Sequence, residues 1–225
     1  MADSKETTLD IGASINKFEG YIENNKKSLI IIGGAIVAVL AAYVLYTNFW
    51  LKPKELKAQQ SIFAAQFNFK NDSIDLAING KGADMGFKQI IDEYGSTKTG
   101  NLAKYYLGMC YMKKDQWQNA IDALKDYDAE DDITGALALG AIGDANMELG
   151  KKDDALDFYK KAADWDDNQF TAPYFLKKQA FAYELKGDYT SAITAYTKIQ
   201  TNFAQSTEAR DVEKYIARAT AKAGK

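Results

Sequence analysis

The sequence predicts an all-α protein, in which one transmembrane helix precedes a solenoid of paired helices. Three observations lead to this prediction. No charged side chain interrupts the apolar run from Ser28 to Leu51. Stretches of similar sequence then recur at spacings of 35 and 37 residues. Strand signals are almost missing after the run, and the two prolines, Pro53 and Pro173, fall at plausible helix boundaries.

The apolar run is too long for a cleaved secretion signal, whose apolar stretch has about 7–15 residues. It has 24 residues, and as a helix it would be about 36 Å long, which is enough for a hydrocarbon core of about 30 Å. Aromatic side chains gather at its C-terminal end, where amphipathic rings favour the headgroup layer: Tyr43, Tyr46, Phe49 and Trp50. We therefore expect a retained single-span anchor rather than a signal peptide or a buried core helix.

Lysines do not decide which way this anchor is oriented. Three precede the run and three follow it closely: Lys17, Lys26, Lys27, Lys52, Lys54 and Lys57. The bias in Lys and Arg that sets orientation is therefore almost balanced.

Composition excludes several classes of function. The chain has 225 residues and a net charge of −3, without the dense basic face that nucleic-acid binding needs, so we expect no nucleic-acid partner. Histidine is absent, which removes Ser-His-Asp triads, Cys-His pairs and His-ligated zinc. The lone Cys110 allows no internal disulfide, and a buried thiol is a better interpretation of it than a nucleophile. We expect no enzyme activity and no cofactor.

The repeats superimpose on three alanines, Ala120, Ala155 and Ala192. In each repeat a second small residue precedes the alanine and a bulky residue follows it by four positions. The small residues are Gly108, Gly143 and Ala180, and the bulky ones are Leu124, Tyr159 and Tyr196. Gly150 and Gly187 occupy the turn before the second helix in two repeats, whereas Asp115 occupies it in the first. These stretches resemble tetratricopeptide repeats, in which small residues let two helices approach closely.

The predicted domain organisation has three parts. Residues 1–27 form a short N-terminal segment, residues 28–51 the anchor, and residues 52–225 the solenoid. Within the solenoid we expect a degenerate unit near 52–95, three clear repeats near 101–134, 136–170 and 173–206, and a capping helix in 207–225. Residues 71–82 depart from the repeat pattern as an insertion in the first unit.

The inner helices of such a solenoid line a concave surface, which is the expected partner-binding site. The predicted groove residues are Tyr105, Met109, Met112, Asp144, Met147, Tyr174, Lys177, Phe181 and Glu184. Flexible methionines beside aromatic rings suit varied apolar peptides. The alternative is that several of these side chains are ordinary core, covered by the C-terminal helix.

Two other patterns stand out, acidic clusters and a stripe of small residues. Acidic clusters at 126–132 and 164–167 fall between repeats and lack the glycine and terminal glutamate of an EF-hand loop, so solvated turns are the better interpretation and no metal site is expected. Within the anchor, Gly34, Ala38 and Ala42 form a smooth stripe that would let another transmembrane helix pack closely.

The whole layout resembles one bacterial family, the ancillary SecYEG translocon subunits (YfgM-type). The resemblance rests on the stretch FEGYIENNKKSLIIIGG, the single span that ends in aromatics and the small repeat domain behind it. It implies a single-pass inner-membrane protein with residues 1–27 in the cytoplasm and the repeats in the periplasm. It also implies the SecYEG translocon, a membrane-anchored parvulin-type peptidyl-prolyl isomerase and membrane lipid as partners. A scaffold for another envelope assembly, such as division or wall synthesis, and a metal-using enzyme stay open as alternatives.

Overall fold

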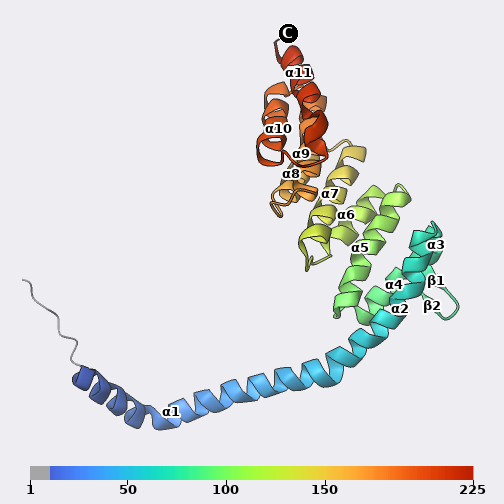
Figure 1. Cartoon of the computed structure of the whole chain (residues 1–225). Helices are drawn as coiled ribbons and strands as arrows, with labels where there is room; N and C mark the ends of the chain where they lie inside the picture. Colours follow the sequence, from blue (N-terminus) through green and yellow to red (C-terminus); the bar gives the residue numbers. More distant parts are fainter. Residues whose placement is uncertain (1–10, 225) are drawn as a thin grey trace, which may run out of the picture. The chain divides into compact units, whose positions relative to one another are not determined.

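The computed structural model describes residues 11–224, with side chains described for Ile22 and from Asn24 onward. The chain divides into two compact units, Met1–Pro53 and Lys54–Lys225. The all-α prediction is confirmed, because helices account for nearly all of the regular structure in the described residues (Figure 1). The predicted segment 1–27 begins in the undescribed part of the chain, and from Ile11 onward it is helical.

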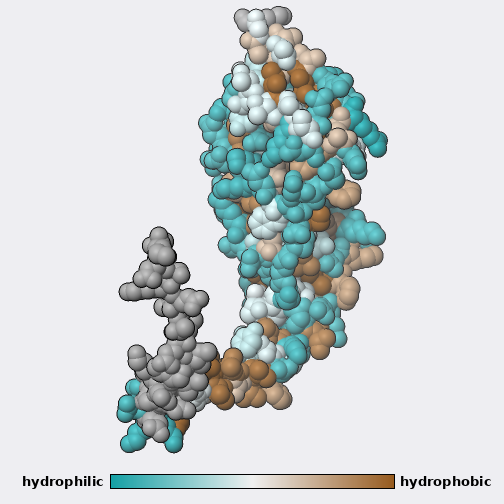
Figure 2. All heavy atoms as spheres, turned by 60° about the vertical axis from the view of Figure 1, so that its left-hand side comes forward, coloured by the Kyte–Doolittle hydropathy of each residue, from teal (hydrophilic) through white to brown (hydrophobic). Residues whose placement is uncertain are grey.

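The first unit is a long helix whose apolar side chains are exposed. Helix α1 runs from Ile11 to Tyr46 and continues into a π-helical turn, η1, from Thr47 to Leu51. The helical stretch Asn24–Lys70 is long and apolar enough to cross a membrane, and none of its most apolar window is buried within the chain. The apolar run forms a brown band in Figure 2, whereas the solenoid face in that view is mostly hydrophilic. Residues such as Ile31, which is 71% exposed, are therefore not covered by other described residues of the chain.

The second unit begins within helix α2, Lys52–Lys70. Its next long element is helix α4, Phe87–Tyr94. The insertion between them folds as a short helix, α3, Ile74–Asn79, and a small antiparallel hairpin, β1 (Gly80–Lys81) and β2 (Asp84–Met85). Two ion pairs tie the insertion to the C-terminal end of helix α5 (Lys98–Lys113): Lys113 contacts Asp72 at 2.7 Å, and Lys114, the residue after the helix, contacts Asp75. The insertion is therefore a compact addition to the degenerate first repeat of the solenoid.

Three helix pairs follow and stack in chain order (Figure 1). They are α5 (Lys98–Lys113) with α6 (Trp117–Lys125), α7 (Asp132–Glu148) with α8 (Lys152–Ala163), and α9 (Thr171–Lys186) with α10 (Tyr189–Asn202). A short 3-10 turn, η2 (Glu208–Asp211), leads into the last helix, α11 (Val212–Ala223).

Small residues set how closely the two helices of a pair approach. A Cβ atom added at Gly108 would lie 2.5 Å from Cγ of Leu124, and one added at Gly143 would lie 2.6 Å from the ring of Tyr159. Each bulky residue thus occupies the space that a larger residue at the glycine would need. The three alanines that define the repeat register, Ala120, Ala155 and Ala192, are fully buried.

The turn between the helices of each pair needs a left-handed backbone. Gly150 and Gly187 have φ values of +73° and +79°, and Asp115 has a φ of +56° at the corresponding place in the first pair. Asp115 therefore adopts the same turn as the two glycines, although side chains other than glycine favour it less.

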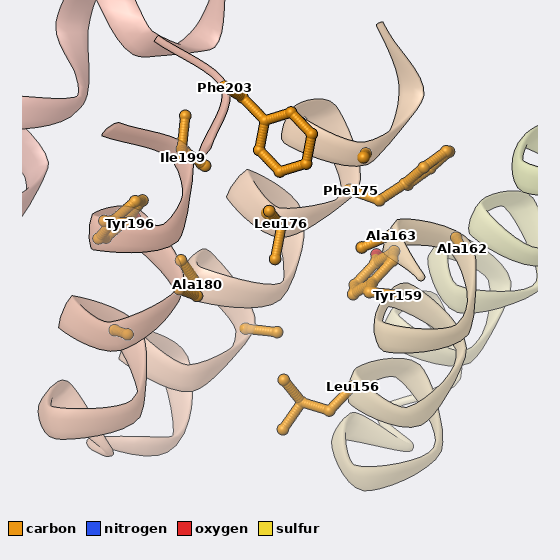
Figure 3. Packing of buried hydrophobic residues seen from close by; sticks show 14 of the residues in the cluster. Leu156, Tyr159, Ala162, Ala163, Phe175, Leu176, Ala180, Tyr196, Ile199 and Phe203 are labelled. Atoms are coloured by element: carbon orange, nitrogen blue, oxygen red, sulfur yellow. The ribbon is translucent and has the colours of Figure 1, made fainter. Parts of the chain in front are cut away.

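The largest buried cluster joins the last two helix pairs to the cap (Figure 3). Leu156 and Tyr159 of α8 face Phe175 and Leu176 of α9 there. Residues Tyr196, Ile199 and Phe203 of the α10 region pack on the other side, and Val212 of α11 belongs to the same cluster. A second cluster joins α2, α3, α4 and α5, and a third joins α6 to α7. The core is therefore a succession of layers between neighbouring helices, as expected for a solenoid.

Candidate functional site

One groove of about 560 Å³ crosses the first helices of the three pairs. Helix α5 contributes Met109 and Met112, and α7 contributes Asp144 and Met147. The remaining lining residues come from the ends of α5 and α7 and from α6, α8 and α9: Lys113, Trp117, Glu148, Tyr159, Lys178, Phe181, Ala182 and Leu185. Because the contributing helices belong to successive repeats, the groove exists only where all three pairs are stacked.

An ion pair lies in the polar part of this groove. Nζ of Lys178 donates to both carboxylate oxygens of Asp144 at 2.7 Å, and the hydroxyl of Tyr159 donates to Oδ1 of Asp144 at 2.7 Å. Burial raises the pKa of Tyr159, and the neighbouring Asp144 raises it further, so the phenol stays protonated and serves as a donor. Asp144 thus has three hydrogen bonds within the chain and holds α7, α8 and α9 together.

The rest of the groove is apolar and adaptable. Met109, Met112 and Met147 are half-buried, and Leu185 at one end is 61% exposed. Methionine side chains are flexible and polarizable, so they fit apolar partners of different shapes. This arrangement suits the binding of apolar side chains.

Five of the nine predicted groove residues line this groove, namely Met109, Met112, Asp144, Met147 and Phe181. Two others lie elsewhere. Tyr105 packs between Tyr106 and Tyr127, with ring centroids 5.7 and 5.5 Å apart. Tyr174 is 42% exposed and packs edge-on against Phe175.

The last two predicted groove residues contact the capping helix. Nζ of Lys177 lies 5.1 Å from the ring centre of Tyr215. The side chain of Glu184 is only 9% exposed, and it accepts hydrogen bonds from Tyr196 at 2.8 Å and from Arg218 at 2.7 Å. Both positions therefore take part in attaching α11 to the last helix pair.

Lys178 lines the groove and lies one position away from the predicted Lys177. A signal for it exists in the sequence, since Lys178 follows Asp144 by 34 residues, about one repeat. Other ion pairs have nearly the same spacing: Lys98 with Glu130, Lys186 with Asp153, Lys198 with Asp164, and Arg218 with Glu184. Opposite charges one repeat apart thus indicate neighbouring positions on successive helices. No comparable signal marks Trp117 or Leu185.

The acidic clusters contain residues with structural contacts. Asp131 is the N-cap of α7 and accepts hydrogen bonds from the backbone N–H groups of Ile133 and Thr134 at 2.9 and 2.8 Å. Asp164 contacts Lys160 at 2.7 Å. Among the described residues, no group of three or more acidic or Cys side chains is arranged to hold a metal ion. Burial raises the pKa of the Cys110 thiol to about 12, which keeps it protonated.

In the first unit, Gly34, Ala38 and Ala42 lie on the exposed surface of α1. A Cβ atom added at Gly34 would meet no atom of the chain within 4 Å. Within the described residues, this small-residue stripe is therefore exposed rather than packed.

Comparisons with known proteins give the class of the repeat unit. The sequence profile of the tetratricopeptide repeat family matches residues 102–130 and 178–206. Two solved structures are similar over most of their length. MamA protein has a TM-score of 0.53 and 19% identity, with 74% of this chain and 89% of that chain covered. A kinesin light chain with nearly identical TPR-like repeats, from Podosopora anserina, has a TM-score of 0.56 and 12% identity, with 75% and 87% covered.

The chain thus carries tetratricopeptide repeats within a TPR-like solenoid, a fold of generally non-catalytic protein-interaction scaffolds. No curated protein sequence matches it.

Proposed function

We propose that this protein is a non-catalytic interaction module anchored in the bacterial inner membrane, which holds apolar segments of other proteins in the groove of its repeats. The observation that carries the proposal is the groove itself, because it joins three methionines, Trp117 and Leu185 across three successive repeats. The apolar run 28–51 would be the anchor, and the solenoid would face the periplasm. A tethered groove gains a high local concentration, so weak contacts with passing chains become useful.

The more specific part of the proposal concerns location and company. The resemblance to ancillary SecYEG subunits favours a place at the translocon exit, together with a membrane-anchored parvulin-type peptidyl-prolyl isomerase. Proteins leaving the channel expose apolar segments before they fold, and such segments match the chemistry of the groove. A scaffold for another envelope assembly, such as division or wall synthesis, is the second candidate, because the same fold would serve it.

The first test is a pull-down of the full-length protein in a gentle detergent, with the recovered proteins identified. SecY and a parvulin-type isomerase are the expected partners. Recovery of division or wall-synthesis proteins in their place would favour the second candidate.

A matched pair of variants then tests the groove. Leu185→Glu places a charge at the exposed end of the groove, whereas Leu76→Glu makes the same change on α3, where the side chain is 38% exposed. We expect the first variant to lose groove-dependent partners and the second to keep them. Equal recovery with both variants would contradict the role of the groove.

The small-residue stripe is tested separately by replacing Gly34 and Ala38 with leucine. Because nothing in the chain lies within 4 Å of a Cβ at Gly34, the fold should tolerate the change. Loss of a membrane partner would assign the stripe to helix packing, and unchanged recovery would remove that role.

A further inference from the structure

Helix α2 has an apolar face that is exposed in the described part of the chain. Leu56, Phe63 and Phe67 are 60%, 67% and 66% exposed. They are spaced by seven and four residues, so they lie on one side of the helix. Ala58 and Ile62 lie on the opposite side and are buried in the solenoid core. Two large exposed aromatic rings in line on one helix face mark an interaction surface rather than a scattered exposure.

The charge on this helix is unlike that of the whole chain. The protein has a net charge of −3, but α2 carries four lysines and one glutamate. That glutamate, Glu55, is turned toward α5, where it accepts hydrogen bonds from Thr99 at 2.6 and 3.2 Å. Lys52, Lys57 and Lys70 are exposed, and Lys52 and Lys70 stand at the two ends of the apolar face. One acidic residue of a neighbouring element, Asp84 of β2, lines a small pocket together with Gln60 of α2.

The position of α2 in the chain indicates which surface is within reach. Helix α2 begins at Lys52, directly after Leu51, where the apolar run ends. If residues 28–51 cross a bilayer, α2 starts at the surface of that bilayer. Leucine and phenylalanine on one face with lysines around them are the composition of helices that lie in the headgroup layer of anionic membranes. A second copy of α2 would instead bring lysines against lysines.

The connection between the run and α2 can bend at low cost. Residues 47–51 form a π-helical turn, and Pro53 follows two residues later. Proline has no N–H to continue the helical hydrogen bonds, and π-helical turns interrupt their regular spacing, so bends in helices concentrate at both features. A bend at this point would bring α2 parallel to the membrane surface.

We propose that the face of α2 formed by Leu56, Phe63 and Phe67 docks on the anionic lipid surface next to the anchor, with Lys52, Lys57 and Lys70 contacting lipid phosphates. This inference rests on the proposed insertion of residues 28–51 in a membrane. It assigns α2 a second role besides starting the solenoid, because docking would fix the repeat unit close to the bilayer.

The experiment places nitroxide spin labels on the full-length protein in vesicles of phosphatidylethanolamine and phosphatidylglycerol. Three variants, each with one added cysteine, are labelled separately: Phe67→Cys on the proposed face, Val39→Cys within the apolar run and Asp157→Cys on an exposed position of α8. Cys110 is fully buried and its pKa is about 12, so the unchanged protein should take up no label. Electron paramagnetic resonance then compares collisions with oxygen, which enters lipid, and with a nickel chelate, which stays in water.

The expected result is that the label at position 67 collides with oxygen more than with the chelate, at a depth of about 5–10 Å. The label at 39 should lie deeper and the label at 157 in water. Replacing Lys57 and Lys70 with glutamine, or removing phosphatidylglycerol, should shift the label at 67 toward water. An unchanged depth in both cases would overturn the role of the lysines.

Three other outcomes would overturn the proposal, each in a different way. A label at 67 as exposed to water as the label at 157, with the label at 39 in lipid, would refute docking and leave the anchor standing. A label at 39 in water would refute the anchor itself. A label at 67 shielded from both reagents, with spin–spin broadening that disappears on dilution with unlabelled protein, would assign the face to a second copy of this chain.

Discussion

The two terminal helices of the solenoid, α2 and α11, differ in the kind of side chain that they expose. At the C-terminal end, α11 buries Val212 and Ala219 and exposes Lys214 and Lys222. At the N-terminal end, α2 buries alanines and Ile62 but exposes leucine and phenylalanine side chains. A solenoid in water needs a polar outer face on its terminal units. Among the described residues, only the C-terminal end meets this requirement by itself, and the proposed docking of α2 on lipid would account for the difference.

The C-terminal end is also the more strongly connected one. Tyr215 of α11 stacks on Tyr196, with ring centroids 5.5 Å apart, and meets Phe181 edge-on at 5.3 Å. The guanidinium of Arg218 lies 5.0 Å from the ring centre of Tyr215 and also binds Glu184. This aromatic and ionic cluster attaches the cap to the third helix pair.

The largest expected effect on the free energy of unfolding comes from replacing one phenylalanine with alanine at each end of the solenoid. Phe203→Ala removes a ring that is 2% exposed in the cluster shared with the cap, and it should lower the free energy of unfolding by about 3–5 kcal/mol. Phe63→Ala, at a ring that is 67% exposed, should change it by less than about 0.5 kcal/mol. Urea denaturation in detergent, followed by far-ultraviolet circular dichroism, measures both. Similar losses would mean that the two ends are equally packed.

The next effect concerns the ionic contact of the cap. Glu184→Ala leaves the hydroxyl of Tyr196 and the guanidinium of Arg218 without their shared acceptor, so we expect a loss of about 2 kcal/mol. Asp153→Ala is the control, because its pair with Lys186 has nearly the same repeat spacing but the Asp153 side chain is 83% exposed. It should cost less than about 1 kcal/mol. Equal losses in the same denaturation assay would remove burial as the explanation.

At the N-terminal end of the solenoid, we expect the contribution of Glu55 to the free energy of unfolding to depend on pH. Burial alone would raise the pKa of Glu55, but hydrogen bonds from Thr99 outweigh it and hold the pKa below its usual value. Since the pKa is lower in the folded state, the stabilisation is complete above the unfolded pKa of about 4.3 and is lost as the pH falls through the folded value. Glu55→Gln should therefore cost about 1 kcal/mol at neutral pH and less in acid. A difference between the two proteins that stays constant with pH would contradict this contact.

The smallest effect compares turns in the first and last helix pairs. Asp115→Gly should raise the free energy of unfolding by about 0.5–1 kcal/mol, because glycine adopts the left-handed backbone without a steric penalty. Gly187→Ala should lower it by about 1 kcal/mol for the converse reason, and no atom of the chain lies within 4 Å of the added Cβ. Opposite signs in the two variants are the result to look for in thermal melts.

The sequence was sufficient for the parts of the fold that depend on local spacing. Small residues at the helix crossings and the register of Ala120, Ala155 and Ala192 follow from a period near 34 residues, and the structure buries all three alanines. The turn at Asp115 followed from the same alignment, although the residue type there is unusual. Such features repeat along the chain, so each repeat supports the interpretation of the others.

The groove was harder to predict because its lining depends on how successive pairs are rotated against each other. Phe181 contacts both the groove and the capping cluster, and Glu184, one helical turn further, belongs to the cap alone. The repeat pattern places Phe181 and Glu184 on the inner face, but it does not predict how far α11 covers that face. The hairpin in residues 80–85 was equally hidden, since strands of two residues leave no periodicity to detect.

The ion pairs that are one repeat apart have a consequence for how such a chain evolves. An acidic residue near the end of one first helix, Asp144 or Glu184, meets a basic residue in the middle of the next, Lys178 or Arg218. In the register of Ala155 and Ala192, which are 37 residues apart, the position equivalent to Lys178 is Tyr215. Loss of the whole α9–α10 unit in that register would therefore place a tyrosine, and not a base, opposite Asp144. Repeat number cannot change in such a lineage without a further substitution at the new junction.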